Sequence, residues 1–198
     1  MQASPPQILP AVYSSDLDRS TAFLDYSSPL RDRQDIKMIA RGLSILLLIT
    51  IPTHIIAYKS GAPETVCDSM IPDHHSTPKT TPSPYTISVS KNSIKAGESV
   101  QVTLAGAKNT QFKGYFIQAR VGNTPIGKFD KGAEINLVNC GGGVATAATH
   151  TDNNDKGKIT LTWTAPDGLS ESVKFRVTFV QTGADYWVGQ ESEPITVK

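Results

Sequence analysis

Hydrophobic and polar positions alternate with a period of two along much of the chain after Tyr85, which is typical of strands that bury one face. Val100, Val102 and Leu104 alternate with polar neighbours, and the segments around Trp163 and Phe175 show the same pattern. We therefore expect strands over residues 85–90, 99–105, 112–121, 134–140, 145–151, 158–164, 173–181 and 193–197.

Clusters of Gly, Pro, Asn and Asp separate these segments, and no segment has the period of a long amphipathic helix. Short strands joined by turns predict an all-β protein, and their number fits an immunoglobulin-like antiparallel β-sandwich. The chain from residue 61 to residue 198 is of ordinary domain size and can enclose one hydrophobic core. We assign residues 61–198 to this single domain.

An apolar stretch at residues 43–52, LSILLLITIP, precedes the domain and follows Met38 and Arg41. Its length and basic start are typical of a secretion signal, since a membrane span needs about 20 apolar residues. We assign residues 38–60 to a signal peptide cleaved between Ala57 and Gly61, which predicts an extracellular, secreted protein. If the segment stays uncleaved, it is a signal-anchor, and the protein is single-pass with an extracellular C-terminal domain.

Residues 1–37 differ in composition from the rest of the chain. They are rich in Pro, Ser and Asp and have no sustained apolar period, so we expect a disordered extension. An upstream start or an alternative transcript would explain these residues, and their presence in the mature product is left open.

The chain has two cysteines, Cys67 and Cys140, and both follow the predicted signal. In an oxidising compartment such a pair is most simply a disulfide. The alternative, a reactive or metal-binding thiol, lacks the C-x-x-C spacing. Residues 77–84 are rich in Pro and Thr and predict an extended lead-in to the first strand, with O-glycosylation of 77–83 as the alternative.

Several short motifs occur in an order that resembles the reeler domain family. They are Gly61-Ala62-Pro63, Cys67, Met70, Pro72, His74, Pro84-Tyr85, the run from Phe112 to Arg120, Gly127, Phe129, Cys140, Thr149-His150-Thr151, the run from Trp163 to Pro166, Phe175 and Tyr186-Trp187. The resemblance covers nearly all of residues 61–198. A signal peptide followed by one such domain resembles the small secreted defence proteins of insects.

The resemblance implies a function in innate immunity: non-catalytic binding of bacterial surface components of the lipopolysaccharide type, and promotion of nodulation by blood cells. A second reading is an extracellular adhesion or matrix module that binds sulfated glycans. A third is a membrane-tethered reeler protein. Fold alone does not decide between them.

Catalytic motifs are missing from the sequence, so we expect no enzymatic activity and no cofactor. There is no G-x-S-x-G elbow, no H-E-x-x-H pair and no phosphate-binding loop. A metal site joining His74 or His75 to His150, with Asp73 as a further candidate ligand, is the weaker alternative to structural roles for these histidines.

Bases and aromatic residues on predicted strands are the candidate ligand-binding residues. Lys and Arg balance Asp and Glu from Gly61 onward, which argues against nucleic acid as a partner and predicts a local basic patch at most. The candidates are Lys113, Arg120, Lys174, Arg176, Tyr186 and Trp187. The two aromatics follow a turn, so one ring could reach solvent and stack on a ligand. For Trp187 the favoured reading is that its large ring completes the core.

Overall fold

The structure is a computed structural model that describes residues 59–198. The predicted extension 1–37 and nearly all of the predicted signal segment lie outside the described residues. The strands are β1 (Tyr85–Val89), β2 (Ser93–Ile94), β3 (Ser99–Gly106), β4 (Gly114–Val121), β5 (Thr124–Pro125), β6 (Lys128–Phe129), β7 (Asn136–Val138), β8 (Ala147–Thr149), β9 (Lys158–Thr164), β10 (Ser172–Val180), β11 (Tyr186–Glu191) and β12 (Ile195–Val197). Two 3-10 turns, η1 (Glu64–Val66) and η2 (Ala107–Asn109), complete the regular structure.

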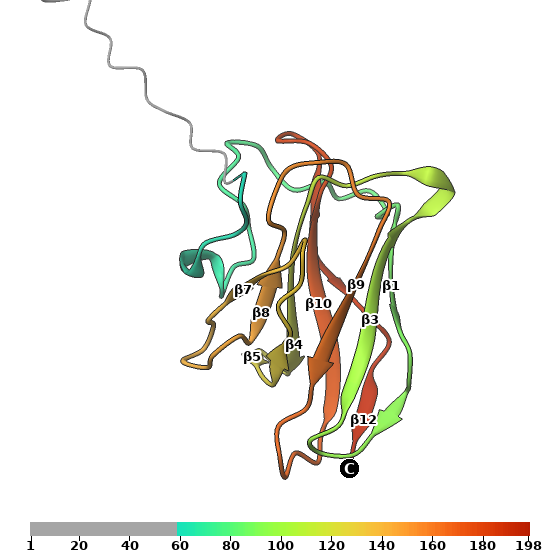
Figure 1. Ribbon diagram of the computed structural model, residues 1–198. Helices are drawn as coiled ribbons and strands as arrows, with labels where there is room; N and C mark the ends of the chain where they lie inside the picture. The colour runs from blue at the N-terminus through green and yellow to red at the C-terminus, as the bar shows by residue number, and fades with distance from the viewer. Residues whose placement is uncertain (1–58) are drawn as a thin grey trace, which may run out of the picture. The chain divides into compact units, whose positions relative to one another are not determined.

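The strands form two facing sheets, as Figure 1 shows. The first sheet has the order β1-β3-β9-β6, and the second has the order β2-β12-β10-β4-β8-β7. Strand β11 also pairs with β10, and β5 pairs with β4. All pairings are antiparallel except that of β12 with β2. The predicted all-β antiparallel sandwich is confirmed.

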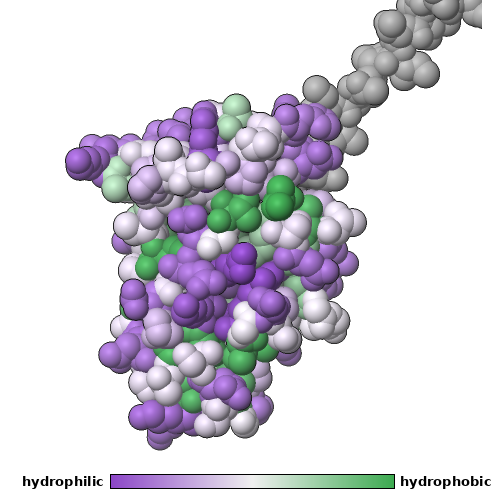
Figure 2. Space-filling view, turned by 180° about the vertical axis from the view of Figure 1, so that it is seen from behind, coloured by the Kyte–Doolittle hydropathy of each residue, from purple (hydrophilic) through white to green (hydrophobic). Residues whose placement is uncertain are grey.

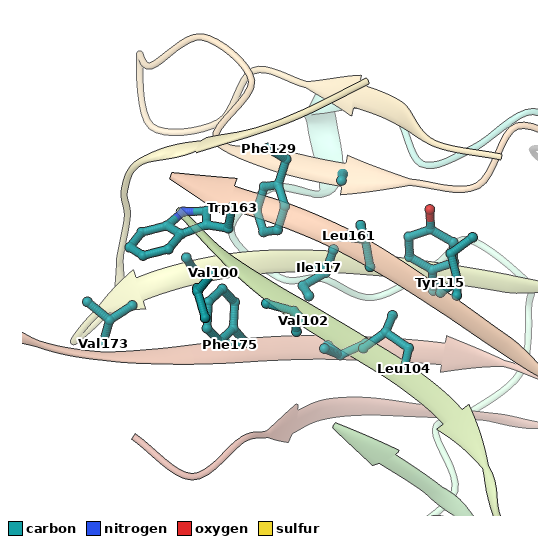
Figure 3. Close-up of a cluster of buried hydrophobic side chains, with 14 of the residues drawn as sticks. Val100, Val102, Leu104, Tyr115, Ile117, Phe129, Leu161, Trp163, Val173 and Phe175 are labelled. Carbon is teal, nitrogen blue, oxygen red and sulfur yellow. The ribbon is translucent and has the colours of Figure 1, made fainter. Parts of the chain in front are cut away.

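The core between the sheets is built from the alternating positions of β3, β9 and β10. Figure 3 shows the side chains of Val102, Leu161 and Phe175 between the two layers. Trp163 is fully buried; its ring meets Phe175 edge-on at 5.4 Å, and its indole N–H donates to the backbone oxygen of Ile126 at 3.0 Å. Burying an aromatic ring of this size stabilises the fold while the N–H keeps a partner.

The second sheet is covered on its outer face as well, by the segment 61–74, which we name the strap. The strap begins the coloured part of the chain in Figure 1 and lies beside β7 and β8. Its residues Cys67 and Met70 form a second buried cluster with Phe116, Val138 and Cys140. Strand β4 is therefore buried on both faces, which explains why its sequence alternates less clearly than that of β3.

A disulfide between Cys67 and Cys140 fastens the strap to the sheet, with the two Cα atoms 5.5 Å apart. The prediction from the two cysteines is confirmed. Residues 77–84 continue from the strap as the predicted lead-in. This lead-in docks on β11: the backbone N–H of Lys79 donates to the Tyr186 oxygen, and the Trp187 indole donates to the Thr81 oxygen.

Strand β11 is the main element that sequence reasoning missed. Its interior contains Gly189 in the left-handed region, with φ of +69°, and its pairing with β10 shifts between Val177 and Phe179. A glycine and a register irregularity both interrupt the two-residue period from which strands are predicted.

Candidate functional site

The outer face of β4 and β10 carries two hollows, one at each end of the strand pair. Antiparallel pairing sets Lys174 opposite Arg120 at one end and Val180 opposite Gly114 at the other. The two ends are six residues apart along β4, which is about 20 Å of extended chain. The covered middle of this face holds the strap and the disulfide.

The first hollow, which we name the basic pocket, has a volume of about 260 Å³. It is lined by Arg120, Gly122, Lys174, Arg176 and Glu191. Three cationic side chains therefore line the pocket together with one carboxylate, that of Glu191. The Lys174 ammonium contacts a Glu191 carboxylate oxygen at 3.0 Å, and an Arg176 guanidinium nitrogen is 4.0 Å from the other oxygen.

Arg176 is held in place by the shape of β11. Its guanidinium lies against Gly189, where an added Cβ would be 2.9 Å from Nη2. The Arg176 Nε is buried without a hydrogen-bond partner among the described residues. Gly189 thus gives the guanidinium its space, and the group keeps hydrogen-bonding capacity beyond its contact with Glu191.

Arg120 forms the fixed back of the basic pocket and is 7% exposed. Its Nε donates to the Gln118 side-chain oxygen at 2.7 Å, and Nη2 donates to the backbone oxygen of Cys67 at 3.1 Å. Burial, followed by the nearby Arg176 charge, lowers the pKa of Arg120, although guanidinium stays charged at any physiological pH. Arg120 therefore contributes charge to the pocket from a rigid position.

Gln118 links this arginine to the disulfide. Its Nε2 donates to the Cys67 backbone oxygen at 2.8 Å and contacts the Cys140 sulfur at 3.3 Å. The strap, the disulfide and the basic pocket thus share one buried hydrogen-bond network. Sequence reasoning missed Gln118, Glu191 and Gly189 as parts of the site. Gln118 could have been found from its position in the sequence. It lies two residues before Arg120, so both side chains lie on the same face of the strand.

The remaining predicted binding residues lie elsewhere. Lys113 precedes β4 at the end opposite Arg120 and pairs with Asp155 at 3.2 Å, so it does not join the basic pocket. Tyr186 is fully buried and Trp187 is 7% exposed. The expectation of a solvent-exposed ring is wrong, and the favoured reading that Trp187 completes the core is confirmed.

The two rings are buried on opposite faces of the sheet. Trp187 packs edge-on against Tyr85 in the main core, at a centroid distance of 5.5 Å. Tyr186 contacts His74 edge-on at 5.6 Å, and its hydroxyl donates to the backbone oxygen of Ser76. Tyr186 therefore anchors the chain just after the strap instead of presenting a surface to a ligand.

The second hollow, which we name the strap pocket, has a volume of about 180 Å³ and mostly apolar walls. Both histidines of the weaker metal hypothesis, His74 and His150, line it. His150 follows β8, as expected for a residue that ends a strand, and its Nδ1 lies 3.2 Å from both the backbone N and O of Tyr115. Within residues 59–198 no group of three His, Cys, Asp or Glu is arranged to hold a metal ion.

His74 is neutral at physiological pH, because burial lowers its pKa more than the Asp73 charge raises it. Its Nδ1 is buried and has no hydrogen-bond partner in the described part of the chain. The imidazole therefore acts as a wall of the strap pocket.

Elsewhere on the surface, Figure 2 shows hydrophilic residues gathered at the middle of the face seen from behind, with apolar patches above and below them.

A comparison with known families identifies the class of protein that this sandwich belongs to. The reeler domain family matches residues 65–198, and the chain belongs to that family. The predicted resemblance is confirmed. The reeler domain of human F-spondin has a TM-score of 0.51 with 20% identity, covering 62% of this chain and 94% of that chain, which supports the fold.

Among curated relatives, a protein of Hyphantria cunea named "Putative defense protein Hdd11" is 42% identical over 146 residues, covering 71% of this chain and 88% of the relative. A Bombyx mori protein named "Putative defense protein" is 38% identical over 147 residues, covering 71% of this chain and 86% of the relative. A Danio rerio protein named "Putative ferric-chelate reductase 1" is 36% identical over 143 residues. That match covers 70% of this chain but 25% of the longer relative.

Proposed function

We propose that this protein is a secreted defence protein that binds phosphate groups of bacterial surface glycolipids, of the lipopolysaccharide type, without catalysing a reaction. The observation that carries the proposal is the basic pocket, in which Arg120, Lys174 and Arg176 surround one carboxylate. The names of the insect relatives support a role in defence. Promotion of nodulation by blood cells would follow from attachment to bacteria.

Phosphate fits the chemistry of the pocket. A phosphate monoester carries close to two negative charges and several acceptor oxygens, which suit the donors of guanidinium and ammonium groups. The two carboxylate oxygens of Glu191 already contact two of these cationic groups, the Lys174 ammonium and the Arg176 guanidinium. A bound phosphate would therefore compete with Glu191 for Lys174 and Arg176.

Binding without chemistry is consistent with the groups that line the basic pocket. They include no hydroxyl, thiol or imidazole side chain, and the carboxylate is engaged in ion pairs. The activity named for the longer Danio rerio relative is not proposed for this chain, because the match covers a quarter of that protein. Within residues 59–198 no helix is long and apolar enough to cross a membrane.

Competition between a bound phosphate and Glu191 can be tested with two variants of the basic pocket. We expect Arg176→Gln to weaken binding of the full chain to lipopolysaccharide by about tenfold, because a charge-assisted contact is lost. We expect Glu191→Gln to strengthen binding, since the competing carboxylate is removed. Surface plasmon resonance on immobilised lipopolysaccharide measures both changes. Lys158→Gln, an exposed cation at the start of β9 in the other sheet, is the matched control.

Equal affinities for all four proteins would contradict the proposal. The alternative reading, an adhesion or matrix module, has the same pocket chemistry because sulfate is also an anion. Heparin binding that depends on Arg176, with no saturable binding to lipopolysaccharide or whole bacteria, would favour the adhesion role. Recovery of the intact chain in the membrane fraction of producing cells would favour the membrane-tethered form.

A further inference from the structure

The strap pocket is separate from the basic pocket and differs from it in chemistry. One wall comes from the strap, with Ala62, Val66 and Met70, and the opposite wall comes from the ends of β4 and β10, with Phe116 and Val180. Gly114, the first residue of β4, also lines the pocket. A Cβ at Gly114 would lie 2.8 Å from the His150 ring, so this position cannot carry a larger side chain.

Apart from the buried Nδ1 of His74, which has no partner among the described residues, the polar groups in the walls are largely satisfied within the protein. The Thr178 hydroxyl donates to the backbone oxygen of Met70 at 2.7 Å. His150 Nδ1 is engaged by the backbone of Tyr115, and the N–H of Ala62 donates to the Thr149 hydroxyl at 3.0 Å. A water molecule needs two to four polar partners to be held in a pocket, and these groups offer few. The pocket therefore favours hydrocarbon over water.

Charges at the rim balance one another and select neither sign. Lys113 is paired with Asp155, and Asp73 is the anion among the residues that line the pocket. Lys59 is the remaining cation among the residues that line the pocket. Because the rim carries little net charge, selectivity must come from the apolar interior.

We propose that the strap pocket binds the end of a saturated alkyl chain of about six carbon atoms, since an apolar cavity of about 150 Å³ takes up a ring of that carbon number. The pocket volume of about 180 Å³ admits such a chain. Met70 is 1% exposed, and its flexible thioether adapts to the shape of an apolar guest. The site does not depend on the proposed anion binding, because it lies at the other end of β4 and β10.

Binding is measured by titrating the full chain, labelled with ¹³C at its methionine methyl groups, with 1-hexanol. Of the three methionines in the chain, Met70 is the one among the described residues, and it lines the pocket. We expect a saturable shift of the Met70 methyl resonance alone. The same shift with fully acylated lipopolysaccharide, but not with the deacylated form, would identify the source of the chain as a glycolipid.

Two variants change the pocket in opposite directions. Ala62→Phe fills it and should weaken hexanol binding by about tenfold, whereas Val66→Ala enlarges it and should shift the preference from 1-hexanol to 1-octanol. Thr65→Phe, on the exposed side of η1, is the matched control and should leave the affinity unchanged.

Arg176→Gln should also leave hexanol binding unchanged, so a failure of the anion site would not be mistaken for a failure of this one. A Met70 resonance that does not saturate overturns the proposal. Hexanol binding that is equally strong in Ala62→Phe and in the unaltered protein also overturns it, because the alcohol would then bind elsewhere.

Discussion

Gly189 is the residue on which the geometry of the basic pocket depends most directly. A methyl group there would meet the Arg176 guanidinium, and the positive φ makes any side chain unfavourable. We expect Gly189→Ala to lower the free energy of unfolding by about 1 kcal/mol for the backbone conformation alone. It should also weaken lipopolysaccharide binding, because the guanidinium has to move.

The matched control for this change is Gly168→Ala in the turn before β10. Its φ is +72°, and no described atom lies within 4 Å of the added Cβ. Urea unfolding and surface plasmon resonance separate the two effects. Both variants should lose similar stability, but Gly189→Ala alone should lose affinity. Unchanged binding by Gly189→Ala would show that the position of Arg176 does not matter for the anion.

His74 makes the stability of the protein depend on pH. Its pKa in the folded state is lowered from 6.5 by burial, so the unfolded chain binds the proton more tightly. Stability from this residue is therefore fully present above pH 6.5 and is lost as the pH falls toward the folded-state pKa. Chemical unfolding at a series of pH values from neutral to mildly acidic measures the slope.

We expect His74→Phe to flatten this slope while keeping an aromatic ring against Tyr186. His75→Phe, at a neighbouring side chain that is 68% exposed, is the matched control. A slope that remains in His74→Phe would assign the pH dependence to other groups.

At the scale of elements, the disulfide is the covalent cross-link between the strap and the sheet. Replacing both Cys67 and Cys140 by Ala opens a loop of 73 residues and should lower the free energy of unfolding by about 4 kcal/mol if the effect is entropic. Because Gln118 and Arg120 bond to the strap at Cys67, the loss should reach the basic pocket. Amide hydrogen exchange at Met70 should accelerate, while exchange at Val102 in the main core should not.

Thr178→Val serves as the comparison, because it removes one hydrogen bond to the strap and leaves the disulfide intact. Its cost should be about 1 kcal/mol. If exchange at Met70 is as slow in the double alanine variant as in the unaltered protein, packing rather than the disulfide holds the strap.

The main strands could be predicted from sequence because their burial follows the two-residue period. Strand β9 has the predicted bounds, 158–164, and its buried positions Ile159, Leu161 and Trp163 alternate with exposed or partly exposed ones. Strand β11 could not be predicted in the same way, since Gly189 breaks the period. The turn at 152–157 was predicted, but not that it buries Lys156 among the oxygens of Asp152 and Asn154.

The candidate site was predictable only within one strand. Alternation along β10 places Lys174 and Arg176 on the same face, as expected. The sequence does not reveal the register that sets Arg120 opposite Lys174, because this depends on how two strands 54 residues apart pair. Lys113 was grouped with these bases because that register cannot be read from the sequence. One ring of the Tyr186-Trp187 pair was expected near the surface because the docking of residues 77–84 on β11 has no local signal.

For the whole molecule, the balance of charge limits how it can recognise an anionic surface. From residue 61 onward Lys and Arg equal Asp and Glu in number, so there is no long-range attraction to a negatively charged membrane. Under the proposed function, recognition would come from the basic pocket over short distances. The Debye length is about 10 Å at 0.1 M salt, so charges on the exposed rim are screened while the buried Arg120 is screened less.

Short-range recognition by the basic pocket predicts how lipopolysaccharide binding responds to salt and to the type of phosphate. Lipopolysaccharide binding should weaken by about tenfold from low to high ionic strength and remain measurable at physiological salt, where the Debye length is about 8 Å. Vesicles of phosphatidylglycerol, whose phosphodiester carries a single charge, should bind much more weakly at the same salt. Co-sedimentation across a salt series measures both. Equal binding to the two surfaces would instead indicate a charge effect spread over the molecule, which the balanced composition of the domain opposes.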